Sequence, residues 1–296
     1  MRLLVALTVF GLASRPALAA WPDDISLSSL PGASGDLICD NTAGDNPDLP
    51  SCYETVVREM GVAIANKGWA PADSLGVNGF ELEVSNTIAF ISSGGPNFGD
   101  VGPWDAVHED QAPRQTLWIP RIQARKGLPF SVDVGGQLGW VATSRQTVFG
   151  GYARWSPIEG YRQGPDIALQ AGYAGYVGNS QLELGVMDFS GTISYTLPFG
   201  SLLNINSASF APYAGGGKLW IHAKPRVGAD EAEEYGVYEV SGFKKSPVYD
   251  ATDPSFNPWV VHGGFRLVSR SFEFKLSTSW APKVMPTLNV GMGFTY

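Results

Sequence analysis

The sequence has few of the residues that most enzymes and metalloproteins use for chemistry. Its 296 residues include only two cysteines and three histidines. Cys39 and Cys52 cannot hold a metal ion alone, since a structural zinc site needs about four ligands. The chain contains no P-loop, Rossmann fingerprint, zinc motif or G-x-S-x-G motif. We therefore predict neither a cofactor nor a metal site.

Positive charge and long apolar runs are also scarce. The chain has 28 acidic residues against 20 Lys and Arg, a net charge of −8, which argues against nucleic acid as a partner because phosphate binding needs positive charge. Beyond residue 20, no run approaches the roughly 18 consecutive apolar residues of a membrane-spanning helix. Glycine is abundant at 36, and aromatic residues make up 12%. This composition suits strands that alternate between two environments.

Residues 1–19 are predicted to be a secretory signal peptide. Arg2 supplies a short positive region, and Leu3 to Ala13 form an apolar core too short to span a bilayer. Ala17-Leu18-Ala19 then offers the small residues of a cleavage site. No cysteine follows this site, so a lipoprotein anchor is not expected. The protein is therefore predicted to be exported through the Sec pathway.

The two cysteines lie close together in the exported part of the chain. Exported proteins meet an oxidising compartment, in which paired cysteines normally form disulfides. We therefore predict a Cys39–Cys52 disulfide, whose short loop would stabilise the fold by about 2–3 kcal/mol. The alternative is a pair of free thiols.

The final segment, residues 287–296, alternates strictly between two kinds of side chain. Its apolar positions are Leu288, Val290, Met292, Phe294 and Tyr296. A period of two predicts a strand with one apolar face and one polar or small face. The segment is about as long as one membrane-crossing β-strand. The last strand of a soluble β-sandwich is the alternative.

The same alternation recurs from Gly76 onward. It predicts further strands at about 79–91, 115–125, 130–142, 146–156, 167–177, 181–197, 209–222, 258–269 and 271–280. Together they predict an all-β fold over residues 76–296. This fold is an antiparallel up-and-down transmembrane barrel of about ten strands, with eight or twelve as alternatives. Near Met187 the apolar phase changes, which predicts a β-bulge.

Charged residues occupy the face opposite to the apolar one. Lipid outside and a polar lumen inside would explain this pattern, whereas a soluble barrel would turn its apolar face inward. Facing side chains on neighbouring strands lie about 5 Å apart, so we predict a lumen charge network of Glu81, Glu83, Arg121, Arg125, Asp133 and Arg154. The other charged residues of this face are Lys218, Arg266, Glu273 and Lys275.

The connections between the predicted strands differ in length. Those at 92–113 and 223–255 are long, and those at 126–129 and 270–271 are short. Transmembrane barrels have short periplasmic turns and longer external loops. Both long connections follow odd-numbered strands, which predicts that they are external and that the barrel starts and ends in the periplasm.

A segment at 20–75 precedes the barrel and carries one predicted helix, Tyr53 to Lys67. Its apolar stripe consists of Val56, Met60 and Ile64. Ser51 and Glu54 have the spacing of a capping box, and Gly68 follows as a stop signal. We expect this segment to lie in the periplasm, cover the barrel mouth or plug the lumen.

The aromatic C-terminal residue, the alternation before it and the signal peptide resemble those of bacterial outer-membrane β-barrels. In that family, the insertion machinery recognises the final strand. The segments Asp166-Ile167-Ala168-Leu169 and Ala211-Pro212-Tyr213-Ala214-Gly215 also look like small barrels of the OmpA-type superfamily. The resemblance implies a place in the cell outer membrane, contact with its lipid and lipopolysaccharide, escort by periplasmic chaperones and no catalysis.

Some small outer-membrane barrels are nevertheless enzymes that need a base, usually histidine. His108, His222 and His262 lie in no such motif. A remote alternative is a lipid-modifying barrel, or an omptin-like protease with His222 near Asp105 or Asp230. We predict a structural or surface-interaction barrel that acts through its external loops. The alternative is a narrow channel for small or hydrophobic solutes, which is less favoured because open aqueous channels have about sixteen strands. The sequence names no external ligand.

Overall fold

The barrel is formed by ten antiparallel strands that close on themselves. The computed structural model describes residues 23–32, 36–37, 39, 51–94, 100–108, 115–159, 164–202, 205–242 and 256–296. The ten strands are β2 (Phe80–Phe90), β4 (Thr116–Leu128), β5 (Val132–Trp140), β6 (Thr147–Ile158), β7 (Asp166–Val177), β8 (Leu182–Ser194), β10 (Ile205–Pro225), β12 (Trp259–Ser269), β13 (Phe272–Ala281) and β14 (Met285–Thr295). The predicted fold class and strand number are confirmed. The predicted signal peptide lies outside the described residues.

Closure comes from the pairing of the last strand with the first, and β10 continues the ring between its neighbours in the sequence. Strand β14 pairs with β2, and Phe80 and Tyr296 exchange backbone hydrogen bonds of 2.9 and 2.8 Å at the end of this seam. Strand β10 pairs with β8 on one side and with β12 on the other. Every strand of the ring therefore has two partners, which removes the exposed edges of an open sheet.

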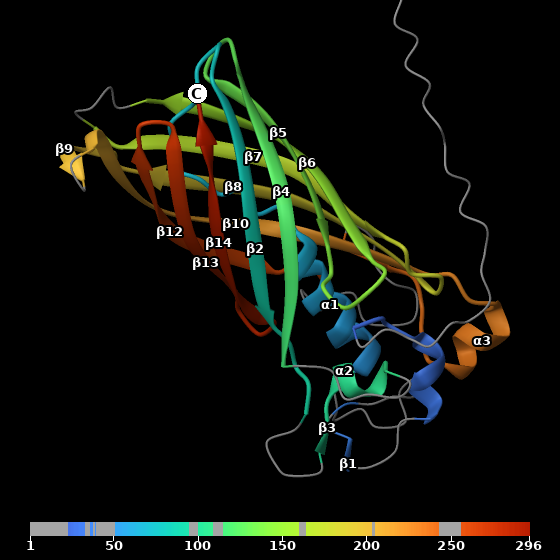
Figure 1. The fold of residues 1–296 in the computed structure, drawn as a ribbon. Helices are drawn as coiled ribbons and strands as arrows, with labels where there is room; N and C mark the ends of the chain where they lie inside the picture. The colour runs from blue at the N-terminus through green and yellow to red at the C-terminus, as the bar shows by residue number, and fades with distance from the viewer. Residues whose placement is uncertain are drawn as a thin grey trace, which may run out of the picture.

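Smaller elements decorate the ring, mostly at the end away from the C-terminus (Figure 1). They are η1 (Leu27–Gly32), α1 (Cys52–Ile64), α2 (Pro103–Ala106), α3 (Ala229–Glu234), and the short parallel pair β1 (Asp36–Leu37) and β3 (Asp100–Val101). Strand β9 (Leu197–Leu202) extends β8 along β10 at the C-terminal end, and β11 (Val240–Ser241) pairs with β10 near the other end. Among the described helices, none is long and apolar enough to cross a membrane.

Side chains on the strands alternate between an apolar outside and a polar inside. On β2, Leu82 and Val84 are 43% and 56% exposed, whereas Glu81 and Glu83 are buried. The apolar residues of β14 also point outward, and Tyr296 at the chain end is 93% exposed. Soluble proteins place their side chains the other way round. This outer surface is therefore stable only in an apolar surrounding such as lipid or detergent.

The predicted β-bulge near Met187 is wrong. Strand β8 keeps one uninterrupted register with both β7 and β10. Leu182, Leu184 and Val186 point inward with the polar residues that follow them, and all three are buried. The apolar phase changes because this part of the lumen contains a helix, so an apolar inner wall is needed there.

The faces of β10 are also corrected by the structure. Leu219, Ile221 and Ala223 are buried in the interior, so Lys218 and His222, at the alternate positions, point outward. The alternation had placed Lys218 in the lumen. This prediction is wrong, because Lys218 points outward. The reason is the same as for β8, because the apolar face of this strand end packs on the helix within the barrel.

Helix α1 begins as predicted but ends earlier. The hydroxyl of Ser51 accepts a hydrogen bond of 3.4 Å from the backbone N–H of Glu54, which caps the first turn. The last helical residue is Ile64, so Gly68 does not terminate the helix. A Cβ atom on Gly68 would lie 2.6 Å from the ring of Tyr152. Glycine is required there because the chain passes close to the barrel wall.

An arginine at the lipid-facing position of Val84 should destabilise the barrel. The Val84→Arg variant, refolded into lipid vesicles and unfolded with denaturant, is expected to lose about 2–4 kcal/mol because a charge would enter the apolar zone. Val84→Leu is the matched control and should change stability little. A Val84→Arg protein as stable as the control would contradict the lipid-facing assignment of this surface.

Candidate functional site

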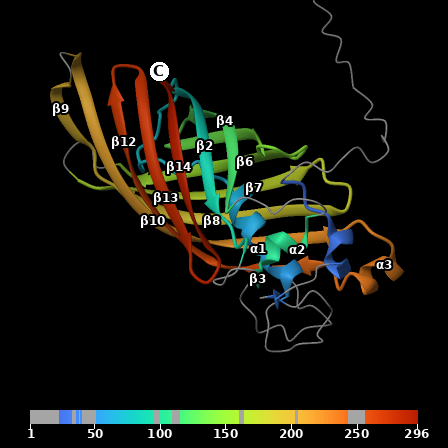
Figure 2. The same cartoon turned by 60° about the horizontal axis from the view of Figure 1, so that its bottom comes forward.

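The N-terminal segment fills the interior of the barrel. Helix α1 sits inside the ring of strands toward one mouth, as both views show (Figures 1 and 2). From the end of α1, residues 65–79 cross the lumen to reach the start of β2, which lies beside the C-terminus at the other mouth. We call residues 63–75 the plug segment, since strands around the barrel bind its backbone and side chains.

Helix α1 packs against an apolar wall inside the barrel. Val56, Met60 and Ile64 are fully buried in the same core as Leu184 of β8 and Ile221 of β10. Gly61 faces this wall so closely that a Cβ atom on it would lie 2.7 Å from the Cδ1 atom of Ile221. Burial of each such side chain contributes about 1.5–3 kcal/mol. Apolar contact therefore holds helix α1, which leads into the plug segment.

Polar side chains of the wall bind the middle of the plug segment. Arg121 donates hydrogen bonds of 2.5 and 3.0 Å to the carbonyl oxygens of Ala63 and Ala65, which the helix end leaves without intrahelical partners. Asn66 donates a hydrogen bond of 2.6 Å to the carboxylate of Asp188 on β8. The two Arg121 hydrogen bonds satisfy backbone carbonyls that would otherwise be buried without partners.

An aromatic contact follows in the next part of the segment. Trp69 stacks on His262 of β12 with ring centroids 4.6 Å apart. The Nε2 atom of His262 lies 3.0 Å from the hydroxyl of Thr192, and the hydroxyl of Tyr213 donates to the carbonyl of Trp69. His262 therefore has a packing and hydrogen-bonding role inside the lumen.

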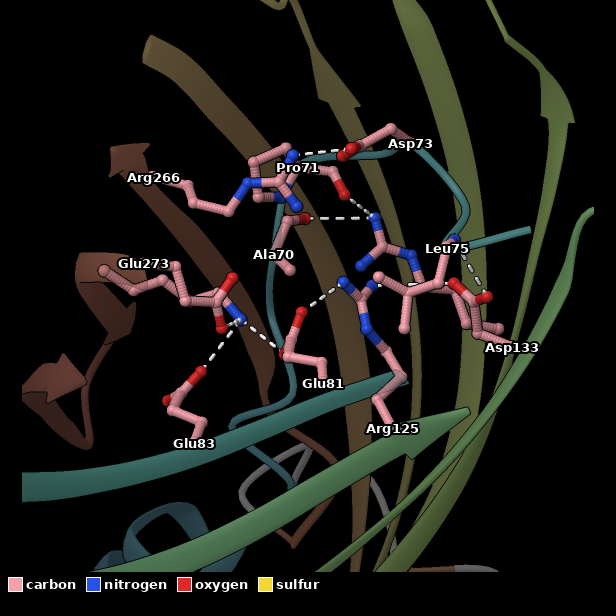
Figure 3. A network of polar contacts seen from close by, with 12 residues as sticks. Ala70, Pro71, Asp73, Leu75, Glu81, Glu83, Arg125, Asp133, Arg266 and Glu273 are labelled. Atoms are coloured by element: carbon pink, nitrogen blue, oxygen red, sulfur yellow. Dashed lines mark hydrogen bonds and ion pairs between the residues drawn. The ribbon is translucent and has the colours of Figure 1, made fainter. Parts of the chain in front are cut away.

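The last part of the plug segment is bound by charged side chains (Figure 3). Arg154 donates to the carbonyl oxygens of Ala70 and Pro71. The Arg266 guanidinium lies 2.5 Å from the carboxylate of Asp73. Two further contacts, from Ala72 N–H to Ser194 and from Leu75 N–H to Asp133, complete this set.

A compact cluster of buried charges lies beside this end of the plug segment. The Lys275 ammonium on β13 is 2.6, 2.8 and 3.2 Å from carboxylate oxygens of Glu81, Glu83 and Glu273. Arg125 on β4 lies 2.6 Å from Glu81. Among the described residues, the carboxylates of these three glutamates lie close enough together to hold a metal ion. In this structure the Lys275 ammonium contacts all three of them.

The charge cluster differs in membership from the predicted lumen network. Glu81, Arg125 and Asp133 come together, with 3.5 Å between Arg125 and Asp133. Arg121 and Arg154 also point inward, but they bind backbone carbonyls of the plug segment rather than the glutamates.

Lys275 lies at the centre of the cluster, although the predicted network did not include it. Strand β14 lies between β13 and β2, and it has Gly291 and Gly293 on its inward face at this level. Because glycine has no side chain, Lys275 on β13 can reach the glutamates of β2 across β14. A Cβ atom on Gly291 would lie 2.3 Å from the carboxylate of Glu83. The signal in the sequence is therefore a pair of glycines on the polar face of the final strand.

The mouth opposite the C-terminus is closed by contacts between the N-terminal residues and the strand connections. The Glu59 carboxylate in α1 accepts hydrogen bonds from Ser92 N–H, the Ser92 hydroxyl and the Trp104 indole at 2.9, 2.5 and 2.7 Å. Burial raises the pKa of Glu59, against the effect of these donors. The predicted Cys39–Cys52 disulfide is confirmed and fixes the segment at the start of α1.

Further hydrogen bonds join the residues before α1 to two other connections. Ser26 N–H donates to the carbonyl of Val107, and the side chain of Asn179 donates to the carbonyl of Ile25, each at 2.8 Å. We call the described residues of this mouth, 23–32, 36–37, 39 and 51–62, the cap.

The histidines do not form the pattern of a hydrolytic site. His108 lies 2.5 Å from the carbonyl of Trp104, and His222 points outward on β10. Asp105 accepts from the N–H groups of Gly94 and Gly102 in its own loop. Within the described chain, no histidine stands in an ion pair with a carboxylate.

Comparison with known proteins gives no family by sequence. No family model matches the chain, and no curated protein matches it. Among solved structures, a KdgM porin is 6% identical, with 73% of this chain and 99% of that chain covered and a TM-score of 0.29. Ail of Yersinia pestis is 8% identical, with 74% and 99% covered and a TM-score of 0.23.

Omp33 of Acinetobacter baumannii is 9% identical, with 77% of this chain and 100% of that chain covered and a TM-score of 0.26. At these scores the likenesses carry no argument about function. The chain's own geometry defines the class of protein. A closed ring of ten strands, apolar outside and charged inside, is the architecture of a small outer-membrane β-barrel.

Loss of a buried charge should destabilise the barrel far more than loss of an exposed one. Arg125→Ala would leave Glu81 and Asp133 short of a partner, so we expect a loss of about 3–5 kcal/mol in unfolding free energy. Arg226→Ala breaks the exposed Arg226–Glu183 pair and should change stability by at most about 1 kcal/mol. Equal effects in a denaturant titration would mean that the lumen is well hydrated.

Proposed function

We propose that this protein is an outer-membrane barrel closed by its own N-terminal segment, with a structural or surface-interaction role and no catalysis. The observation that carries the proposal is the plug segment, which Arg121, Arg154, Arg266, Asp133 and Asp188 hold from several sides of the lumen. A barrel whose interior is filled by packed, hydrogen-bonded chain is suited to present a surface rather than to conduct solutes.

The connections support an orientation with the cap outside the cell. Two of the turns at the C-terminal mouth are short, since β4 ends at Leu128 and β5 starts at Val132, and β12 ends at Ser269 and β13 starts at Phe272. The two longest connections begin and end at the other mouth, with the cap, since β2 ends at Phe90 and β4 starts at Thr116, and β10 ends at Pro225 and β12 starts at Trp259. Long loops are external in transmembrane barrels. The surface offered to external partners would therefore combine these loops with the cap.

The proposal also assigns the surroundings of the protein. The outward apolar face would contact outer-membrane lipid and lipopolysaccharide. Leu288, Val290, Met292, Phe294 and Tyr296 would be read by the barrel insertion machinery, after Sec export and escort by periplasmic chaperones.

A gated channel is the second candidate function. It is favoured by the polar nature of the contacts around Ala70 to Asp73, because water can replace a hydrogen bond to a carbonyl oxygen far more readily than it can replace an apolar contact. Release of this part of the segment would expose a lumen lined by charges of both signs.

The two candidates predict different currents in a planar lipid bilayer. The wild-type protein should give no steady current because its lumen is filled. Arg154→Ala combined with Arg266→Ala should give intermittent openings, since both arginines hold the segment from Ala70 to Asp73. Arg145→Ala, an exposed change at the capped mouth, is the control and should stay closed. A steady wild-type current would overturn the closed-lumen proposal in favour of the channel.

The orientation can be tested by labelling single cysteines in intact cells. The described part of the chain has no free thiol, so an introduced cysteine reports its own position. Ser28→Cys, in the cap, should react with a membrane-impermeant maleimide in intact cells. Ser271→Cys, in the turn between β12 and β13, should react only after the outer membrane is permeabilised. The reverse pattern would show that the cap faces the periplasm.

A further inference from the structure

The carboxylate of Asp73 in the plug segment lies among three arginines of the barrel wall. The Arg266 guanidinium on β12 is 2.5 Å from its Oδ2 atom (Figure 3). Arg125 on β4 and Arg154 on β6 lie close enough to add to the attraction on this carboxylate. The wall therefore forms a carboxylate-binding site, and the chain fills it with one of its own side chains.

The Arg266–Asp73 pair uses only part of what each group can bind. One hydrogen bond joins Nη2 of Arg266 to Oδ2 of Asp73. Among the described residues, neither Nε of Arg266 nor Oδ1 of Asp73 has a hydrogen-bond partner. A free carboxylate can accept two parallel hydrogen bonds from one guanidinium. A diffusing carboxylate that binds Arg266 through both oxygens can therefore compete with the tethered one.

The site is open to solvent on one side. The side chain of Arg266 is 7% exposed, whereas that of Asp73 is 33% exposed. Residues 74–76, which follow Asp73 toward the C-terminal mouth, are also partly exposed, and residues 70–72 are buried. The Asp73 side chain can therefore turn into water, and a small solute can reach Arg266 from the C-terminal mouth.

Acidic side chains of the wall limit the charge that this site can accept. Those near the site are Glu81, Asp133 and Glu273. Arg125 already pairs with two of them, and the third acts on Arg266 from β13. A solute with one carboxylate would replace the charge of Asp73 and leave the net charge of the site unchanged. Phosphate would bring additional negative charge close to these acids, which is costly away from water.

Displacement of Asp73 would release only a short part of the plug segment. The N–H of Ala72 donates to the Ser194 hydroxyl at 2.7 Å, and the N–H of Leu75 donates to Asp133 at 3.1 Å. Water can replace such hydrogen bonds once this stretch meets solvent. Helix α1 is held by apolar contacts instead, so residues 72–75 can move while the helix stays in place.

We infer that Arg266, together with Arg125 and Arg154, binds the carboxylate of a small solute with one negative charge, and that Asp73 occupies this site when the solute is absent. The inference goes beyond the closed-lumen role, because the lumen takes up a solute at its C-terminal mouth. Binding requires no conduction. Only the source of the solute rests on the proposed orientation, in which this mouth faces the periplasm.

The test measures the binding of propionate to the purified full-length protein in phosphatidylcholine nanodiscs by saturation-transfer NMR. Asp73→Asn keeps the shape of the side chain but removes the tethered competitor. It should tighten binding about tenfold or more, since apparent affinity rises with the fraction of molecules whose site is vacant. Arg266→Gln should weaken binding about tenfold or more, because a charge-assisted hydrogen bond is lost.

Two controls separate this site from a general effect of charge. In the Asp73→Asn, Arg266→Gln double variant, the gain from Asp73→Asn should disappear, because that gain requires the Arg266 guanidinium. Arg226→Gln makes the same arginine change in the exposed pair with Glu183 and should bind propionate like the wild type.

Hydrogen exchange reports whether the solute displaces the plug segment. Saturating propionate should speed the exchange of the Ala72 and Leu75 amides in the wild type and leave the amides of β13 unchanged. Propionamide, a neutral molecule of the same shape, should neither bind nor change the exchange of these amides.

Each outcome of these measurements supports or overturns a definite statement. Equal or weaker binding to Asp73→Asn, a gain that persists without Arg266, or equal binding of propionamide would overturn the inference. Tighter binding of inorganic phosphate than of propionate would refute the assignment to a monocarboxylate. The planar-bilayer currents test the proposed function separately. A closed wild-type lumen without propionate binding would refute the site alone, and a steady wild-type current with Asp73-dependent binding would refute the closed lumen alone.

Discussion

The cost of leaving a charge unpaired away from water is the constraint on which this structure depends. The lumen is narrow, and the inward faces of the strands carry arginines, a lysine and several carboxylates. Lys275 and Arg125 satisfy Glu81, and so connect β13, β2 and β4 into one electrostatic unit. Among the described residues, Arg121 and Arg154 form no such ion pair, and the plug segment supplies them with backbone carbonyls instead. The barrel and its plug segment are therefore complementary.

Alternation in the sequence was sufficient to predict the number of strands and most of their faces. It succeeds wherever a strand separates only two environments, apolar outside and polar inside, as on β2 and β14. It fails on β8 and β10, where Leu184 and Ile221 face an interior made apolar by α1. These strands separate an apolar outside from an interior that is partly polar and partly apolar. Alternation of apolar and polar residues cannot distinguish an apolar residue that faces the outside from one that faces the helix.

The lumen site was predictable in composition but only partly in partners. Alternation along the strands placed Glu81, Arg125 and Asp133 on the same face of neighbouring strands, and in the structure they lie together. Nothing in the sequence indicates that Arg154 would bind the carbonyls of Ala70 and Pro71, since any residue type offers a carbonyl. Contacts between a side chain and a distant backbone depend on the path of the chain in space.

The path of the plug segment makes the molecule a threaded ring. The chain runs through a ring of strands that is closed by backbone hydrogen bonds at the β14–β2 seam. A folded cap held by the Cys39–Cys52 disulfide acts as a stopper at one mouth, and at the other mouth the thread is covalently continuous with β2. Withdrawal toward the C-terminal mouth therefore requires the cap to unfold or the seam to open. The folded cap and the barrel are mechanically interlocked, so either the thread is in place before the last pair of strands joins, or the cap crosses the closed ring unfolded and folds afterwards.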